Sequence, residues 1–258
     1  MPTPEIRQVL ITVKAYPNPS VKYGETVCCA GIDIETFEWV RLYPIPYRDL
    51  DESQKFEKYS IIKVRCWKAE DDHRIESYKV DADSIEKVDH IGTDDNWGKR
   101  KRIVLPTVST SFCEIVGNTE KNKSIGVFQP VDVRFSWKKA SMENEDARNA
   151  CYAQLCFFEK SKKAIEQIPF DFYYDFKCCN TPDCLGHKLP IVDWEIGQAY
   201  RSWRYNYQPS ENLLAKIRER WLDRICSVKN DVYFFVGNMK RFRDKFMVLG
   251  VFYPKKKK

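Results

Sequence analysis

Short segments in which apolar and polar residues alternate fill the first half of the chain and constrain its fold most. The clearest, YSIIKVRCWK at 59–68, has the period-two pattern of a half-buried strand. Further strands are expected at 6–13, 25–34 and 38–43, and the last two are joined by a short polar turn, as in a hairpin. Strands this short, closely spaced and punctuated by Pro, Gly and Asn are typical of a small barrel, which we predict over residues 1–138.

The second half of the chain has a different pattern. Residues 144–167 are rich in Ala, Glu, Lys and Gln and carry apolar residues at helical spacing, which predicts one or two helices. We expect further helices at 194–203 and 210–227, and two apolar strands at 231–237 and 246–253. The predicted fold class is therefore α+β. Its predicted units are an OB-like β-barrel domain at 1–138, an α+β domain with a Cys/His cluster at 139–254 and a basic tail at 255–258.

The net charge by itself indicates no particular partner. It is +6, but four of the 43 basic residues are the terminal Lys255–Lys258, and the remainder nearly balance the 37 acidic residues. A nucleic-acid surface must therefore come from local patches. No apolar run approaches the ~18 residues of a membrane span. Without a recognisable secretion signal, the ten cysteines are better explained as reduced thiols or metal ligands than as disulfides. We expect a cytoplasmic protein that binds no membrane.

The stretch KCCNTPDCLGHKLPIVDWE at 177–195 concentrates candidate metal ligands. Cys178, Cys184 and His187 form a C-x5-C-x2-H pattern, and zinc prefers four such thiolate and imidazole ligands in a tetrahedron. The fourth ligand is either the adjacent Cys179 or a thiol from elsewhere in the chain. The distant thiols are Cys113, Cys151, Cys156 and Cys226. We predict a structural zinc, against the alternative of a polar loop with incidental thiols and a solvated histidine.

Two carboxylates, Asp193 and Glu195, close the same stretch. Paired carboxylates can hold a magnesium ion for phosphodiester cleavage. The segment that follows reads as a helix, however, and acidic residues at a helix start satisfy free amide groups. A nuclease of the D-(D/E)-x-K type also needs a lysine two residues after the second acid, where this chain has Gly197. We therefore expect helix capping, with a metal-dependent nuclease or nucleotide-processing enzyme as the alternative.

Basic and aromatic residues occur together in three places. Segments 201–207 and 240–245 combine them directly, and the strand at 38–43 places a tryptophan, an arginine and a tyrosine on one face. We expect that face to be exposed, because a core rarely takes an arginine. Basic side chains neutralise phosphates while exposed rings stack on bases, although each patch alone is also compatible with a solvated surface. The predicted nucleic-acid-binding residues are Trp39, Arg41, Tyr43, Arg201, Arg204, Lys240, Arg241 and Arg243.

Two segments carry a resemblance to known bacterial proteins. The stretch KYGETVCCAGIDIETFEWVRLYP at 22–44 resembles the opening of bacterial dual-OB domain proteins, in which such a strand pair begins a small barrel. The second half, with CCNTPDCLGH, DWE, FFVGN and VLGVFYP, resembles a group of uncharacterised bacterial proteins with a Cys/His zinc-type loop. The resemblance implies association with nucleic acid in an antiviral defence or conflict system with several protein components. It supplies no catalytic residue.

These observations predict a protein that binds single-stranded RNA or DNA and carries a structural zinc. No Gly-rich phosphate loop and no Ser-His-Asp order is visible, so no complete catalytic set supports an enzyme. The nuclease alternative rests on Asp193 and Glu195. A protein-interaction scaffold without a nucleic-acid role is the third hypothesis.

Overall fold

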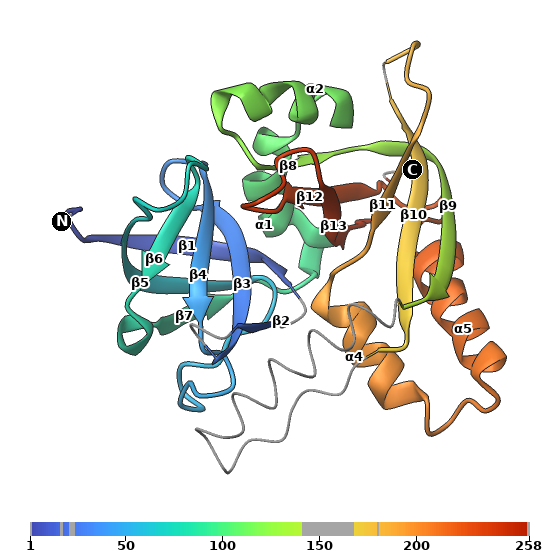
Figure 1. Cartoon of the computed structure of the whole chain (residues 1–258), viewed down its shortest axis with the longest axis horizontal. Coiled ribbons are helices and arrows are strands. Elements are labelled where there is room, and N and C mark those ends of the chain that lie inside the picture. Colours follow the sequence, from blue (N-terminus) through green and yellow to red (C-terminus); the bar gives the residue numbers. More distant parts are fainter. Residues whose placement is uncertain (1, 16–17, 21–23, 141–167, 180, 257–258) are drawn as a thin grey trace.

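The computed structural model describes residues 2–15, 18–20, 24–140, 168–179 and 181–256. It contains an N-terminal β-barrel followed by a mixed α+β part, which confirms the predicted fold class (Figure 1). In the described part of the chain, no helix is long and apolar enough to cross a membrane.

Five strands close the barrel. They are β1 (Glu5–Lys14), β3 (Gly24–Asp33), β4 (Trp39–Ile45), β5 (Ser60–Lys68) and β6 (Ser77–Val80). Their order is β1-β3-β4-β6-β5, and β5 pairs again with β1, so the ring is complete. All pairs are antiparallel except the parallel pair of β4 and β6. The arrangement fits an OB-like fold, in which β3 and β4 are the second and third strands.

Two short strands are attached to this ring, and one glycine is essential to it. Strand β2 (Asn18–Ser20) pairs with β3, and β7 (Glu86–His90) pairs with β5. A Cβ atom at Gly31 would lie 2.1 Å from the carbonyl oxygen of Leu10, so the close approach of β1 and β3 requires glycine at this position.

The barrel buries both faces of its first strand. Val9 and Ile11 point into the barrel, while Leu10 and Val13 point outward into a second core that also contains Leu249 of the second half. This explains why residues 9–13 read as a mainly apolar run rather than an alternating one. The barrel and the second half therefore share a core instead of meeting across a polar surface.

The second half consists of two three-stranded sheets with helices around them. One sheet has the order β11-β10-β9 and the other the order β13-β12-β8. The strands are β8 (Ile125–Phe128), β9 (Pro130–Lys139), β10 (Phe170–Cys178), β11 (His187–Pro190), β12 (Tyr233–Asn238) and β13 (Phe246–Phe252). The α-helices are α1 (Asp94–Val104), α2 (Phe112–Gly117), α4 (Trp194–Trp203) and α5 (Ser210–Arg218). Three short 3-10 helices are η1 (Ala82–Ser84), η2 (Leu105–Thr107) and η3 (Asn118–Lys121), and η4 (Glu219–Ile225) is a π-helix.

The barrel is shorter than the region in which we predicted it. Its strands and β7 lie before residue 91, whereas β8 and β9, which fall inside the predicted unit 1–138, pair with β12 and β10. Alternation shows that one face of a strand is buried but not which sheet the strand joins. The division into domains at residue 138 stays a prediction, and the helices expected at 144–167 lie outside the described residues.

Candidate metal centre and nucleic-acid interface

Two segments that lie far apart in the sequence bring four side chains of metal-ligating type together. Cys113 lies in α2, Cys178 ends β10, Cys184 lies in the following loop and His187 begins β11. Their donor atoms all lie within 4.8 Å of one another. The Nε2 atom of His187 is 3.2 Å from the Sγ atom of Cys184 and 3.3 Å from that of Cys113. The Sγ atoms of Cys113 and Cys178 are 3.7 Å apart.

Local structure explains how these side chains meet. Strands β10 and β11 are antiparallel with Phe176 opposite His187, so the loop between them returns His187 to the end of β10. Gly186 has a φ of 100°, a left-handed conformation that glycine adopts without strain. On the other side, the Ser111 hydroxyl accepts a hydrogen bond from the Glu114 amide, which caps α2 and fixes its first turn, where Cys113 lies.

The environment of the cluster affects its protonation. Burial raises the pKa of the Cys113 thiol to about 12. Burial also opposes ionisation of Cys184, but backbone N–H groups of Cys178 and Gly186 lower the pKa of that thiol below its ordinary value. Burial lowers the pKa of His187, which favours the neutral imidazole that binds metals. The described cysteines form no disulfide, and the four side chains could hold a metal ion.

The fourth candidate ligand comes from a distant part of the sequence. Cys179 does not join the cluster, because neighbouring residues on a strand point to opposite faces and Cys178 already points inward. Cys113, one of the alternatives, takes its place. The Cys226 thiol instead donates to the Trp221 carbonyl oxygen at 3.3 Å. Cys151 and Cys156 lie outside the described residues.

Asp193 caps a helix, as predicted, and also meets a lysine that the sequence gave no reason to expect. Its carboxylate accepts a hydrogen bond from the Glu195 amide at the start of α4. The Lys58 Nζ atom donates to both carboxylate oxygens of Asp193, at 3.1 and 2.9 Å, and lies 3.3 Å from Glu195. Burial lowers the pKa of Lys58, but the two carboxylates outweigh it and raise that pKa above its ordinary value. Lys58 precedes Asp193 by 135 residues, so no local motif could reveal the pair.

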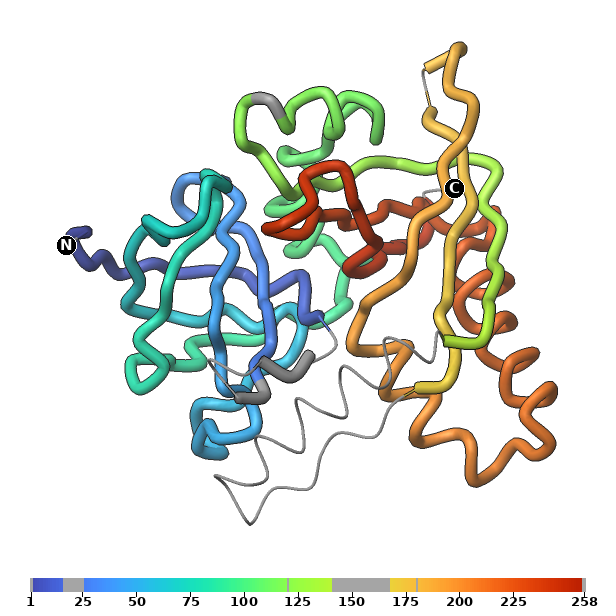
Figure 2. Tube along the Cα trace, in the orientation of Figure 1, coloured from blue at the N-terminus to red at the C-terminus, as the bar shows by residue number. Residues whose placement is uncertain are grey.

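A cleft of about 410 Å³ is lined by residues of barrel strands β3 and β4 and of the loop that joins β12 to β13. Figure 2 shows the backbone of this loop, in dark red, beside the blue barrel strands. It brings together four predicted nucleic-acid-binding residues from opposite ends of the sequence: Arg41 and Tyr43 on β4, and Lys240 and Arg241 in the loop. Five basic residues line the cleft against two acidic ones. Its positive charge therefore does not depend on the basic C-terminal tail.

Ion pairs organise the basic residues of the cleft. Asp71 accepts from both Lys79 and Lys240, each at 2.9 Å, and these hydrogen bonds hold the pKa of Asp71 well below its usual range. Asp72 pairs with Arg74 at 2.7 Å. Asp71 and Asp72 are thus both paired, and the cleft still has more basic than acidic side chains.

The prediction that Arg41 is exposed was wrong. It is 4% exposed, and its Nη2 atom donates to the carbonyl and hydroxyl oxygens of Ser124, at 3.3 and 3.2 Å. The reason is that the second half covers this face of the barrel and supplies hydrogen-bond acceptors, so an arginine can be buried there. Tyr43 on the same strand is half-buried.

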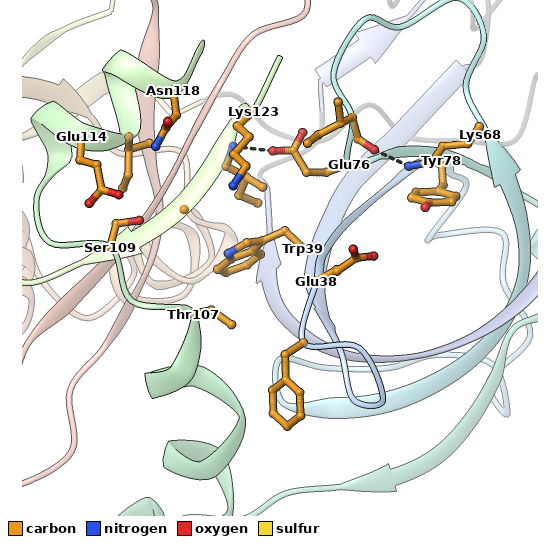
Figure 3. A pocket seen from close by; sticks show the side chains of 15 residues that line it. Glu38, Trp39, Lys68, Glu76, Tyr78, Thr107, Ser109, Glu114, Asn118 and Lys123 are labelled. Carbon is orange, nitrogen blue, oxygen red and sulfur yellow. Dashed lines mark hydrogen bonds between the residues drawn. The ribbon is translucent and has the colours of Figure 1, made fainter. Parts of the chain in front are cut away.

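The other predicted residues lie apart from one another. Trp39 is half-buried against Phe235 and lines a second cavity of about 480 Å³, where Figure 3 shows its ring reaching from the barrel toward Thr107 and Ser109. Arg201 and Arg204 lie at the far end of α4, distant from the β12–β13 loop (Figure 1). Arg243 is exposed in that loop. Four of the eight predicted residues, Arg41, Tyr43, Lys240 and Arg241, thus line the cleft, and the other four do not.

Comparison with known families divides the chain in two. Residues 5–106 match a family model described as Domain of unknown function (DUF8758). Residues 108–258 match one described as Domain of unknown function (DUF8757). No curated protein matches the sequence. The first match covers the barrel and α1, and the second covers all four candidate metal ligands.

Proposed function

We propose that this chain, which belongs to the family described as Domain of unknown function (DUF8757), binds single-stranded nucleic acid in the cleft between β3–β4 and the β12–β13 loop. One observation carries the proposal: Arg41 and Tyr43 share that cleft with Lys240 and Arg241, although nearly two hundred residues separate the two pairs. The second and third strands of an OB-like barrel form the face on which such barrels bind oligonucleotides.

The chemistry of the cleft suits a single strand. Lys240 is 44% exposed and Arg241 and Arg243 are exposed, so these side chains can reach phosphate groups. Tyr43 and the 52% exposed Phe242 provide rings for base stacking, which is tolerant of sequence. Binding of this kind depends on the charge of the phosphates and on bases that are not paired in a duplex.

Salt dependence tests the proposal. Each phosphate contact with a single strand contributes ~0.7 to the slope of log affinity against log salt concentration. Arg241→Ala combined with Arg243→Ala should therefore flatten the slope by up to ~1.4 for a labelled oligonucleotide. Arg201→Ala combined with Arg204→Ala removes the same charge away from the cleft and should leave the slope unchanged. Equal flattening by both pairs, or no binding at low salt, contradicts the proposal.

A nuclease is the second candidate, and Lys58 is the observation that favours it. It places an ammonium group beside Asp193 and Glu195, where the sequence lacks a lysine. Against it, Asp193 is 2% exposed and already accepts from Lys58 and the Glu195 amide, which favours a structural ion pair. Adding manganese to the same labelled strand should produce no cleavage; cleavage that Glu195→Gln abolishes would establish the nuclease instead.

We further propose that the Cys–His cluster holds a structural zinc. Zinc bonds of about 2.3 Å to sulfur and about 2.0 Å to nitrogen give a tetrahedron with S–S edges of about 3.8 Å and S–N edges of about 3.5 Å. The observed Sγ–Sγ distance of 3.7 Å and Sγ–Nε2 distances of 3.2, 3.3 and 3.6 Å fit these edges. Four protein ligands complete the coordination, as in structural rather than catalytic sites.

The defence role, the protein partners in a multi-component system and the cytoplasmic location stay predictions. They rest on the resemblance and composition described above, and the binding proposal does not depend on them.

A further inference from the structure

One carboxylate in the cleft is held between two lysines that come from opposite halves of the chain. Asp71 lies in the segment between β5 and β6, Lys79 lies in β6 and Lys240 lies in the β12–β13 loop, and all three line the cleft. The Lys79 Nζ atom is 2.9 Å from Asp71 Oδ1, and the Lys240 Nζ atom is 2.9 Å from Asp71 Oδ2. The side chains of Asp71, Lys79 and Lys240 are 50%, 36% and 44% exposed, so a ligand can reach their charged groups.

The neighbouring acid, Asp72, has a structural role. It pairs with the Arg74 guanidinium at 2.7 Å, and the two side chains are only 8% and 10% exposed. It also accepts a hydrogen bond from the Arg74 backbone amide at 3.1 Å, while Arg74 Nη1 donates to the Asn238 carbonyl oxygen at 3.1 Å. Asp72 therefore helps to fix the barrel to the end of β12, because removing one partner of a buried ion pair is strongly destabilising.

Asp71 is not fixed in this way. Among the described residues, Lys79 and Lys240 are the hydrogen-bond and ion-pair partners of its carboxylate, and no backbone amide donates to it. Ion pairs as exposed as these contribute little to stability, because water solvates the separated charges nearly as well. An anionic ligand can therefore displace the Asp71 carboxylate from both lysines without disturbing the fold.

We infer that Lys79 and Lys240 form a phosphate subsite of the cleft, which Asp71 occupies in the free protein. The inference rests on the proposed function and names the side chains that hold one phosphate of the strand. A carboxylate and a phosphate diester both present anionic oxygens to charged N–H donors, so the same two ammonium groups can bind either. Because the phosphate must first displace Asp71, this carboxylate weakens binding of the strand and reduces its salt dependence.

Asp71→Asn tests the subsite, because it removes the competing charge and keeps the size of the side chain. It should strengthen binding of a short labelled single strand about fivefold at low salt, since one more positive charge becomes available to the phosphates. The slope of log affinity against log salt concentration should steepen by ~0.7, the value for one additional phosphate contact. Fluorescence anisotropy over a series of salt concentrations measures both changes.

Asp223→Asn is the matched control. Asp223 is 47% exposed and pairs with Arg218 at 3.1 Å, and neither residue lines the cleft. This variant changes the net charge of the protein by the same amount and should leave affinity and slope unchanged. Adding Lys240→Gln to Asp71→Asn should return the slope to its wild-type value, because the gain depends on the lysine that Asp71 had neutralised.

The outcomes separate the subsite from the proposed function. If the wild-type protein binds the strand, the subsite is overturned when Asp71→Asn binds it no more tightly, or when Asp223→Asn gives the same gain, and the proposed function stands. If no variant binds the strand, the proposed function falls and inorganic phosphate alone decides. Replacing sodium chloride by sodium phosphate at equal ionic strength should then raise the melting temperature of Asp71→Asn more than that of the wild type and of Asp223→Asn. An equal rise in all three proteins overturns the subsite.

Discussion

Lys58 shows how a single side chain can join two parts of a chain. It is 9% exposed and contributes an ammonium group from the barrel to Asp193 and Glu195 at the start of α4. Nearby, the Lys14 Nζ atom lies 3.1 Å from the centre of the Tyr47 ring and 4.5 Å from that of Trp194. Removing one member of a buried ion pair leaves the other charge uncompensated, which is far less favourable than losing a surface pair.

Lys58→Met should therefore lower the free energy of unfolding by ~3–5 kcal/mol in denaturant titrations, because it leaves the Asp193 carboxylate buried without its cationic partner. Adding Asp193→Asn should recover part of this loss, giving a coupling energy well above ~1 kcal/mol. Lys216→Met is the control, since its pair with Glu219 is partly exposed and should contribute at most ~1 kcal/mol. Additive effects of Lys58→Met and Asp193→Asn would show that the pair is not coupled.

For single residues, the sequence predicts local roles such as helix capping better than it predicts contacts with residues far away in the chain. The capping role of Asp193 was predictable, because it depends only on the residues that follow it. Lys58 was not, since its partners are 135 residues away. The exposure of Arg41 was predicted wrongly for the same reason. The alternation in β4 indicates on which face of the strand Arg41 lies, but the segment that covers this face, which includes Ser124, is 83 residues away.

Among the elements, the Cys–His cluster connects α2 to the β10–β11 hairpin. Three of the four candidate ligands lie within ten residues and were predictable from their spacing, because a short loop brings them together. Cys113 could only be one of several candidates, since 65 residues separate it from Cys178. Helix α4 was predicted from its apolar periodicity, whereas the partner sheets of β8 and β9 were not.

Metal analysis of reduced protein purified without a histidine tag should give about one zinc per chain, with four ligands. Cys184→Ser should reduce this to near zero and lower the melting temperature by roughly 5–10 °C, because metal binding contributes to folding. Cys179→Ser alters the adjacent cysteine outside the cluster and should keep the metal. Freshly purified wild-type protein with no metal, or loss of zinc in Cys179→Ser alone, would overturn the assignment.

In the whole molecule, the barrel and the second half share a hydrophobic core. Ile32 and Ala30 of the barrel pack in the same core as Phe235, Leu249 and Phe252. The boundary between the two family matches, at residue 107, therefore separates segments that bury each other's apolar side chains. The barrel itself was predictable from alternation, but this shared core was not, because a fully apolar strand does not identify its second partner.

The intact chain should unfold in one cooperative transition in calorimetry and denaturant titration. A fragment of residues 1–107 should show a broad transition and bind a hydrophobic dye, because it exposes the outer faces of β1 and β3. Mixing it with residues 108–258 is the control and should restore a sharper transition. A fragment that melts cooperatively at the temperature of the intact protein would show that the halves are independent.

The closed barrel also limits how another protein can join this one. Each of its five strands already has a neighbour on both sides, so none of them presents an open edge along its whole length to a strand from a partner. The attached β7 has an open side, but its five residues, EKVDH, are all exposed and mostly charged, which opposes edge-to-edge association. Among the described strands, the outer strands of the two three-stranded sheets therefore offer the better edges for β-augmentation, and a protein that docks on the barrel contacts mainly side chains.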